Sequence, residues 1–572
     1  MQSDHSSRTN VPVPISEGGV PQFTEAMMSR LAAYGSEIET LPGQKLFARG
    51  TRSVDLFIVL EGVVELFDCN GTMRTVVASL TPGQFTGELD LISNRETLLE
   101  CQVIIEGRVL RVGRLALQRL MRAEPDIAEL IIWACIGRRN GLVAQSLGGV
   151  ILIGRKTCGP TMTIQRFLLR NEYPHRLLDL DTDCEARALF ECLALTTQDL
   201  PAAVLPGHRV LGAPSILALA DALGLTEPID GAEICDVAIV GAGPAGLAAA
   251  VYAASEGLTT IIIEGNSPGG QAGTSSKIEN YLGFPTGISG QELANRAQVQ
   301  AQKFGARLVV SRQVTAMECH DQACRLLLEG GRSVTARSVI VATGARYRKL
   351  DVPKFEFYET QGIHYAATPM EAAICVDQDV VVVGGGNSAG QAAIFLSQSA
   401  RHVHLLIRGD GLEFSMSDYL IHRIASSPKI TLHVRSEIVR LEGDSILREV
   451  TWSTGVGAVT VTREVGNVFV MIGASPNTEW LRGVVGLDEK GFVETGIPGG
   501  FPSVYATTLP GIFAVGDVRA HSVKRVASAV GEGSVVVSDV HRYFAELNMG
   551  ARLTAPTAAS NVPAGSSFQA NA

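Results

Sequence analysis

Hydrophobic and polar positions follow two different patterns along this chain. Near the N-terminus, alternating runs separated by glycine turns, at residues 44–50, 55–62 and 63–67, predict an antiparallel barrel or roll. From residue 148 onwards, short runs of buried-type residues lead into helix-forming segments. Strands that alternate with helices are typical of α/β domains. The pattern therefore predicts a multidomain α/β chain in which a β-roll comes first.

The clearest strand–turn–helix unit begins at Cys235. A β-branched run ends at Gly241, Gly243 and Gly246 complete a G-x-G-x-x-G spacing, and an alanine-rich segment follows. Glycine at these positions permits a tight turn, the approach of a pyrophosphate to the backbone and close packing of helix on strand. The next strand ends at Glu264, about 23 residues on, where an acid binds the ribose of a dinucleotide. The unit predicts a dinucleotide-binding domain.

A second unit of the same kind occupies residues 379–390. Its strand leads into Gly384 and Gly386, and Ala389 takes the third, close-packing position. Two such units predict two bound dinucleotides. The following strand ends at Arg408 rather than at an acid, and a cation there favours the 2′-phosphate of NADPH, with NADH as the alternative.

Further short segments resemble the low-molecular-weight thioredoxin reductase family: Gly-Gly-Gln at 269–271, Glu-Asn at 279–280, Ala-Thr-Gly at 342–344 and Gly-Asp at 516–517. In that family the nicotinamide domain is inserted into the FAD domain. The resemblance implies two Rossmann-like domains of the three-layer ββα type. It places an FAD-binding domain at 232–347 and 474–548 and an NAD(P)H-binding domain at 348–473.

The family's cofactor contacts carry over to matching positions of this sequence. The implied FAD contacts are Gly241, Gly243, Pro244, Ala245, Gly246, Glu264, Gly270, Gln271, Asn280, Thr343, Gly344, Gly516, Asp517, Arg525 and Val526. The implied NAD(P)H contacts are Gly384, Gly386, Asn387, Ser388, Ala389, Arg408, Ile472 and Gly473.

The family's redox-active dithiol does not carry over. Counting back from the second glycine turn, the C-x-x-C position is occupied by Ala367, Thr368, Pro369 and Met370. Glu371 follows them as a candidate proton-transfer acid, and a solvated helix face is the favoured alternative interpretation. Hydride transfer from nicotinamide to flavin needs orientation rather than side-chain chemistry. The sequence therefore predicts that the electrons leave the flavin for another acceptor.

The N-terminal segment, residues 21–145, resembles the cyclic-nucleotide-binding domain through Leu-Phe-x-x-Gly, Leu-Phe-Ile-Val-Leu-x-Gly and Gly-Glu-Leu patterns. In that family the glutamate binds the ribose and a later arginine neutralises the phosphate, which implies a site at Gly87, Glu88 and Arg95. Arg95 comes early and is followed by Glu96 and bulky leucines, which weakens a phosphate site. We favour a degenerate domain kept for regulation or packing. A cyclic nucleotide effector is the alternative.

Residues 148–226 resemble the thioredoxin and glutaredoxin fold in their order of strands and helices. Cys158-Gly-Pro-Thr161 stands where that family has Cys-Gly-Pro-Cys, and Pro201 stands where it has a cis-proline. A helix N-terminus stabilises a thiolate. Cys158 is therefore a candidate monothiol that could form a mixed disulfide but could not complete a dithiol cycle alone. The favoured alternative is a packing cysteine in a redox-inactive adaptor.

Composition narrows the choice of partners. The 572-residue chain has a net charge of -10 and no basic run, which disfavours nucleic-acid binding. No apolar run reaches the length of a membrane span and the polar N-terminus lacks a signal-peptide pattern, so we expect a cytoplasmic protein. The 10 cysteines, with no C-x-x-C pair, argue against a disulfide framework and a zinc ribbon, and no metal site is predicted. The low-complexity ends, 1–20 and 549–572, are expected to be disordered.

Three functions remain open. The favoured one is an FAD-dependent NAD(P)H oxidoreductase that passes a hydride to flavin and electrons to an unidentified acceptor: a small disulfide, a ferredoxin or flavodoxin, a quinone or oxygen. The second retains disulfide reduction of the thioredoxin reductase type, through Cys158 or the thiols of a partner. The third is a sensor of flavin state or of a cyclic nucleotide. Because relatives are usually homodimers, the resemblance also implies a homodimer.

Overall fold

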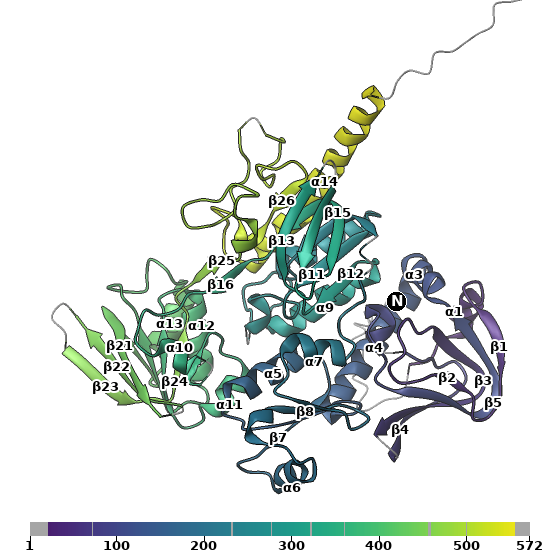
Figure 1. The fold of residues 1–572 in the computed structure, drawn as a ribbon, viewed down its shortest axis with the longest axis horizontal. Coiled ribbons are helices and arrows are strands. Elements are labelled where there is room, and N and C mark those ends of the chain that lie inside the picture. Colours follow the sequence, from purple (N-terminus) through teal and green to yellow (C-terminus); the bar gives the residue numbers. More distant parts are fainter. Residues whose placement is uncertain are drawn as a thin grey trace, which may run out of the picture.

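The computed structural model describes residues 21–554, except 71–72, 88, 230, 232, 276, 321–322, 360, 445, 456–458 and 499. Four bodies follow one another along the chain (Figure 1): a roll in purple, a small α/β domain in blue, a large central domain in teal and yellow, and a second large domain in green. Within the described residues, no helix is long and apolar enough to cross a membrane.

The N-terminal body is the antiparallel roll that the alternating pattern predicts. Its sheet has the strand order β1-β5-β3-β4, with β2 also paired to β5, and every pairing is antiparallel. Three short helices and one long one complete it. The elements are α1 (Glu25–Leu31), β1 (Ser36–Thr40), β2 (Lys45–Phe47), β3 (Leu56–Asn70), β4 (Met73–Leu80), α2 (Leu89–Ser93), β5 (Glu100–Val112), α3 (Arg114–Ala123) and α4 (Pro125–Gln145).

The small α/β domain has the strand order β7-β6-β8-β9. Strands β6 and β7 are parallel, whereas β8 runs antiparallel to β6 and β9. The Leu200–Pro201 peptide bond is cis, as the resemblance implies for Pro201. The elements are β6 (Val150–Gly154), α5 (Gly159–Arg170), β7 (His175–Asp179), α6 (Cys184–Cys192), η1 (Thr197–Asp199), β8 (Ala202–Val204), β9 (Val210–Gly212) and α7 (Ile216–Ala222).

The central domain is built on a mixed sheet in the order β12-β11-β10-β15-β14-β13, with β26 added beside β15. Strands β10, β11, β12, β15 and β26 are parallel, and β13 to β15 form an antiparallel meander. The elements are β10 (Ile234–Val240), α8 (Pro244–Ser255), β11 (Thr260–Glu264), η2 (Ala272–Thr274), α9 (Gly290–Lys303), β12 (Arg307–Val310), β13 (Val314–His320), β14 (Ala323–Leu328), β15 (Ser333–Val341), η3 (Glu479–Leu481), β26 (Ile512–Ala514), η4 (Gly516–Val518) and α14 (Val526–Thr554).

The second large domain is inserted between β15 and β26. Its parallel sheet has the order β17-β24-β18-β19-β20, and an antiparallel sheet β21-β22-β23 packs beside it. The chain enters along β16 and returns along β25, which pair with each other. The elements are β16 (Ala345–Tyr347), α10 (Phe355–Tyr358), β17 (Ile363–His364), α11 (Pro369–Ile374), β18 (Asp379–Val383), α12 (Asn387–Leu396), β19 (His402–Leu406), α13 (Asp418–Ala425), β20 (Ile430–His433), β21 (Ser436–Gly443), β22 (Leu447–Thr454), β23 (Val459–Glu464), β24 (Asn467–Val470) and β25 (Ala474–Pro476).

Two local features differ from the sequence expectations. Helix α14 continues to Thr554, so it enters the segment expected to be disordered, whose remainder lies outside the described residues, as do residues 1–20. A disulfide joins Cys319 and Cys324, which face each other across the β13–β14 hairpin. Their spacing is not that of a framework motif, and the pairing follows from the strand register.

A single buried apolar cluster extends from the roll through the small α/β domain into the central domain. Val59 of β3, Leu152 of β6 and Ile239 of β10 all belong to this cluster. The first three bodies therefore share a continuous core, which fixes their relative placement.

Candidate functional site

The first glycine turn, between β10 and α8, admits no side chain at two of its positions. A Cβ at Gly241 would lie 2.3 Å from the Ala342 carbonyl oxygen, and one at Gly246 would lie 1.9 Å from the Gly241 carbonyl oxygen. Gly243 caps α8, and Pro244 occupies its first turn. The helix therefore starts close to the strand with its N–H groups directed out of the turn, which suits a pyrophosphate.

Glu264 lies at the end of β11, beside this turn. Its Oε2 accepts a hydrogen bond from the Ala242 amide at 2.8 Å, and its Oε1 accepts one from the Asn266 amide at 3.0 Å. Burial raises the pKa of the Glu264 carboxyl, while the two amides and Arg170 oppose that change. An acid anchored next to the glycine turn fits the ribose of a dinucleotide.

The Gly-Gly-Gln loop folds over the first turn. The Gly269 amide donates to the Ala242 carbonyl at 2.8 Å, and a Cβ at Gly270 would lie 3.1 Å from the Gly243 Cα. Gln271 donates to the Ala345 carbonyl at the start of β16. The predicted residues Gly243 and Gly270 are thereby in contact.

Other predicted FAD residues lie directly beside the first turn: a Cβ at Gly241 would lie 3.0 Å from the Thr343 Cα, and one at Gly516 would lie 2.9 Å from the Ala245 Cβ. The Thr343 hydroxyl donates to the Asn477 carbonyl at 2.9 Å, and the Asn477 amide nitrogen donates to the Gly344 carbonyl at 3.2 Å. Burial raises the pKa of the Asp517 carboxyl, and Lys524 opposes this. Gly516 lies in η4, and Arg525 and Val526 lie at the start of α14. Asn280 is exposed.

The second glycine turn opens onto a cavity of about 600 Å³ between the two large domains. At Gly384 a Cβ would lie 2.3 Å from the Met471 carbonyl oxygen, so this turn also requires glycine. Ala389 is fully buried and packs behind the turn rather than in the cavity. The other predicted NAD(P)H contacts line the cavity: Gly384, Gly386, Asn387, Ser388, Arg408, Ile472 and Gly473.

Arg408 is exposed just after β19. Its neighbour Asp410 pairs with Arg435, and among the described residues Arg408 itself has no ion-pair partner. Arg423, another cation of this domain, pairs with Glu279 of the central domain at 3.1 Å and does not line the cavity. Of these two arginines, Arg408 is the one that lines the cavity.

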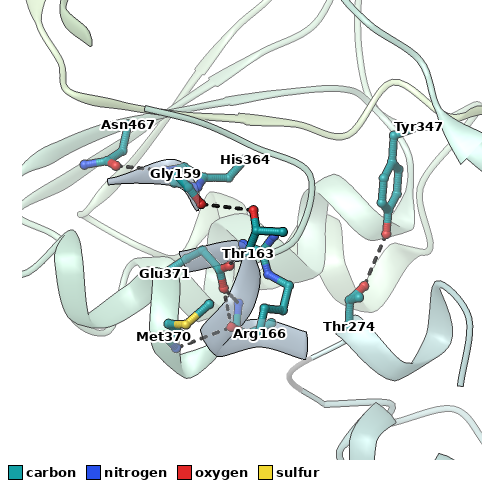
Figure 2. Close-up of polar contacts among 10 residues, drawn as sticks. Gly159, Thr163, Arg166, Thr274, Tyr347, His364, Met370, Glu371 and Asn467 are labelled. Carbon is teal, nitrogen blue, oxygen red and sulfur yellow. Dashed lines mark hydrogen bonds and ion pairs between the residues drawn. The ribbon is translucent and has the colours of Figure 1, made fainter. Parts of the chain in front are cut away.

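The expected dithiol position lies at the start of α11. Thr368 caps the helix by accepting from the Met370 amide, and the Thr368 amide donates to Glu371 Oε2 at 3.0 Å. Glu371 is fully buried and accepts from Arg166 of α5 at 2.6 Å (Figure 2). The expectation of a solvated helix face at Glu371 is therefore wrong, because a helix of the small α/β domain covers it.

The Glu371 carboxyl keeps its charge despite this burial. Burial alone would raise its pKa, but Arg166 and the Thr368 hydroxyl outweigh that effect, so the pKa is lowered. An ionised carboxylate held by an arginine is an anchor rather than a proton donor. This geometry does not favour Glu371 as a proton-transfer acid.

Helix α5 contacts both large domains. Arg166 reaches α11, while Arg170, one turn later, donates to the carbonyl oxygens of Gly270 at 2.9 Å and Pro268 at 3.3 Å. Cys158 is the N-cap residue at the other end of the helix and is partly exposed. Cys375, at the C-terminal end of α11, is buried, and burial raises its pKa to about 12, as expected for a packing cysteine.

Comparison with known proteins places the two large domains. Residues 235–533 match the family described as pyridine nucleotide-disulphide oxidoreductase. The chain belongs to this family. A thioredoxin reductase of Mycolicibacterium smegmatis is 38% identical over 311 residues, which cover 54% of this chain and 97% of the relative. Just over half of this chain thus corresponds to nearly the full length of this relative.

Solved structures agree with this placement. The thioredoxin reductase of Lactococcus lactis, in a state titled the FR conformation, superposes with a TM-score of 0.51 at 30% identity and covers 55% of this chain and 99% of its own. The thioredoxin reductase of T. acidophilum gives the same TM-score and coverage at 28% identity. The chain is therefore an FAD-dependent NAD(P)H oxidoreductase of the thioredoxin reductase type.

The N-terminal roll of the oxidoreductase matches the cyclic nucleotide-binding domain family over residues 37–124. Arg95, the residue predicted to bind the phosphate, does not point toward the predicted site at Gly87. It is buried and donates to the Asn171 carbonyl of the small α/β domain at 2.7 Å. Gly87 lines a separate cavity in the roll. Glu88 lies outside the described residues. Among the residues that the structure describes, Arg95 and Gly87 therefore do not share a site.

Sequence reasoning missed several residues at the oxidoreductase's cofactor sites. Tyr347 and Lys524 line the nicotinamide cavity from the central domain's side. Glu532 of α14 accepts from the Gly516 amide at 2.6 Å and pairs with Arg519. Tyr347 could have been suspected from its place just after the Ala-Thr-Gly turn. Arg166 and Arg170 carry no local signal, because each acts on a segment about 100 or 200 residues away.

Among the described residues, no group of three or more His, Cys, Asp or Glu side chains is arranged to hold a metal ion.

Proposed function

We propose that this oxidoreductase moves electrons from NADPH, by way of FAD, to an acceptor other than a dithiol of its own nicotinamide domain. One observation above all supports this. The residues at the expected dithiol position carry no thiol, and α5 is docked beside them through the buried Arg166–Glu371 pair. The acceptor classes that fit are a small disulfide, a ferredoxin or flavodoxin, a quinone and oxygen.

The chain's own contribution is position. FAD, when bound, accepts a hydride from the nicotinamide and releases the electrons to an acceptor. In our proposal the first glycine turn and Glu264 hold the FAD pyrophosphate and ribose, and the second turn and Arg408 hold the NADPH phosphates. Gln271 and Tyr347 line the cavity from the FAD side and set how deeply the nicotinamide enters. Alignment is what hydride transfer requires of the protein.

Anaerobic titration of the flavin-loaded protein with NADPH tests the first half of this proposal. We expect the flavin absorbance to be lost at one equivalent, and persistence of the absorbance would contradict the proposal. Stopped-flow mixing of the bleached protein with one acceptor from each class tests the second half. We expect one class to restore the absorbance much faster than the other classes do. Restoration that depends entirely on Cys158 would favour the second candidate instead.

The second candidate is disulfide reduction through Cys158, as the relatives' name, thioredoxin reductase, suggests. It is favoured by the position of Cys158, which is the partly exposed N-cap residue of α5, the helix that contacts α11 through Arg166. A thiolate there attacks a disulfide, expels one substrate thiol and forms a mixed disulfide. Two electrons and a proton then cleave the mixed disulfide, which releases the second substrate thiol and restores the Cys158 thiolate. The electrons that reduce the disulfide come from NADPH through FAD.

Replacement of Cys158 by serine separates the two candidates. Cys184→Ser is the matched control, because Cys184 is an exposed cysteine in the same domain. If electrons pass through Cys158, NADPH-dependent reduction of dithionitrobenzoate falls to background in Cys158→Ser and not in Cys184→Ser. Equal turnover by both variants removes this route.

A further inference from the structure

The roll contains a cavity of about 170 Å³ between β3, β4 and helix α4. Aliphatic side chains form most of its wall, with a gap opposite Gly141 of α4. The residues that define it are Leu66, Ala78, Leu80, Leu99, Gly141 and Leu142. A cavity with this lining attracts apolar molecules.

The size of this cavity limits what it can hold. An apolar cavity of about 150 Å³ accommodates one benzene molecule and stays dry without it. A cyclic nucleotide carries a two-ring or one-ring base, a ribose and a charged phosphate, which is much more than one ring. The roll cavity is thus of single-ring size.

Two polar side chains of the cavity wall donate to backbone carbonyls of the roll. The Thr97 hydroxyl donates to the Ala48 carbonyl at 2.9 Å. Arg138 donates to the Gly87 carbonyl at 2.6 Å, and its guanidinium lies 4.7 Å from the centre of the Phe85 ring. A phosphate buried here would have to compete for these donors, and an unpaired buried charge is strongly disfavoured.

The arginine predicted to bind a phosphate, Arg95, does not point into this cavity. Arg95 is absent from the cavity wall and is buried against the small α/β domain, where it donates to the Asn171 carbonyl. This hydrogen bond links the roll to the small α/β domain. A cyclic nucleotide in this cavity would lack the cation that its family supplies.

We propose that the roll cavity binds a small, neutral, largely apolar molecule of the size of one aromatic ring, and not a cyclic nucleotide. Gly141 is the feature that keeps the space open, because a Cβ there would meet no heavy atom within 4 Å. Glycine inside a helix is unfavourable relative to alanine, so its presence in α4 has a structural consequence. Here that consequence is the room beside Leu142.

The cavity wall is connected to the rest of the oxidoreductase. Leu66, Leu99 and Leu142 belong to the buried cluster that extends into the small α/β and central domains. Beyond α4, the Gly148 amide donates to Asp68 at 2.9 Å and its carbonyl accepts from Arg49 at 2.5 Å. Occupancy of the cavity is therefore expected to stabilise the full chain as well as the roll.

Fluorine NMR of fluorobenzene with the full-length protein tests the proposal. We expect saturable binding to the wild type and a weakening of at least about tenfold in Gly141→Leu, whose side chain fills the cavity. Ala78→Leu fills the same space from β4 and covers the case in which the helix variant does not fold. Asn140→Leu is the matched control, because Asn140 is exposed on the same helix, and we expect wild-type binding from it.

Three results would overturn the proposal. One is the absence of saturable fluorobenzene binding to the wild type. Another is undiminished binding by both filled variants when thermal unfolding shows that they are folded. The third is displacement of fluorobenzene by cyclic AMP or cyclic GMP, which would return the cavity to the family's ligand. None of these results depends on flavin or NADPH, so they leave the proposed electron transfer untouched.

Discussion

The two glycine turns have nearly the same backbone and very different surroundings. In both, a parallel strand ends at a glycine whose Cβ would lie 2.3 Å from a carbonyl oxygen of a neighbouring strand. The first turn is covered by the Gly269–Gly270 loop, which Arg170 holds in place. The second opens onto a cavity of about 600 Å³ with exposed Arg408 at its edge.

This difference separates two kinds of binding. A covered turn with a partly buried acid suits a cofactor that stays bound, whereas an open turn with an exposed cation suits a coenzyme that must enter and leave at each turnover. The same local motif can therefore hold a resident or an exchanging dinucleotide. Contacts from other domains decide which.

The largest effect is expected from a methyl group inside the covered turn. In Gly246→Ala the Cβ would lie 1.9 Å from the Gly241 carbonyl oxygen, a backbone atom that cannot move away cheaply. We expect loss of bound FAD and a cost of about 1–3 kcal/mol or more in unfolding free energy. Flavin absorbance of the purified protein and chemical unfolding measure these. Gly531→Ala, a helix glycine with no heavy atom within 4 Å of its added Cβ, should retain FAD.

A smaller effect is expected when the cover over the first turn is loosened. Arg170→Ala removes the charged donor to the Gly270 and Pro268 carbonyls. Such bonds are worth about 1.5–3 kcal/mol, so FAD dissociation should accelerate by about tenfold to a hundredfold. Arg176→Ala, which removes an exposed pair with Glu185, is the control. Equal dissociation rates in both variants would mean that the cover does not retain the cofactor.

The open turn is expected to discriminate between coenzymes through one side chain. Arg408→Gln removes the cation at the edge of the cavity, and we expect the KM for NADPH to rise by about tenfold while that for NADH is unchanged. Anaerobic flavin reduction at varied coenzyme concentration gives both values. Arg440→Gln, an exposed arginine of the same domain away from the cavity, should change neither. A parallel rise for NADPH and NADH would show that Arg408 does not read the 2′-phosphate.

The smallest effect is expected from the loss of the Glu371 carboxylate, which pairs with Arg166. The pKa of Glu371 is lowered in the folded protein, so its charge stabilises the fold above its unfolded pKa of about 4.3 and this contribution is lost as the pH falls through the folded-state pKa. Glu371→Gln should therefore cost about 1–2 kcal/mol at pH 7, with a difference from wild type that shrinks below about pH 4.5.

Denaturant unfolding between pH 7 and pH 3.5 measures this dependence. Glu356→Gln is the control, because Glu356 is a mostly exposed glutamate of the same domain. Its difference from wild type should stay near zero across the range. If the difference in unfolding free energy between Glu371→Gln and wild type does not change with pH, the contact between Arg166 and Glu371 does not depend on the charge of Glu371.

Local spacing predicted the features that depend on neighbouring residues. The glycine turns, the acid after β11 and the cation after β19 are each defined by a short run of sequence and a strand direction. The antiparallel roll follows from the alternating pattern, whereas the cis bond before Pro201 was implied by the resemblance to the thioredoxin fold. The match of residues 235–533 to the oxidoreductase family confirms the type of enzyme that these features indicated.

Long-range contacts were out of reach of that reasoning. The buried state of Glu371 depends on Arg166, 205 residues earlier, and the orientation of Arg95 depends on Asn171, 76 residues later. The Cys319–Cys324 disulfide requires the register of a hairpin. No spacing rule contains these pairings, because the first two are set by how domains pack on one another and the third by strand register.

The sequence by itself thus determined which two dinucleotide sites this oxidoreductase has, since glycine is the residue that tolerates such turns wherever they occur. The tertiary structure alone decided which turn is covered, what occupies the space beside the expected dithiol, and how small the cavity in the roll is. Those properties arise from surfaces of separate domains, and such surfaces meet only when the whole chain has folded.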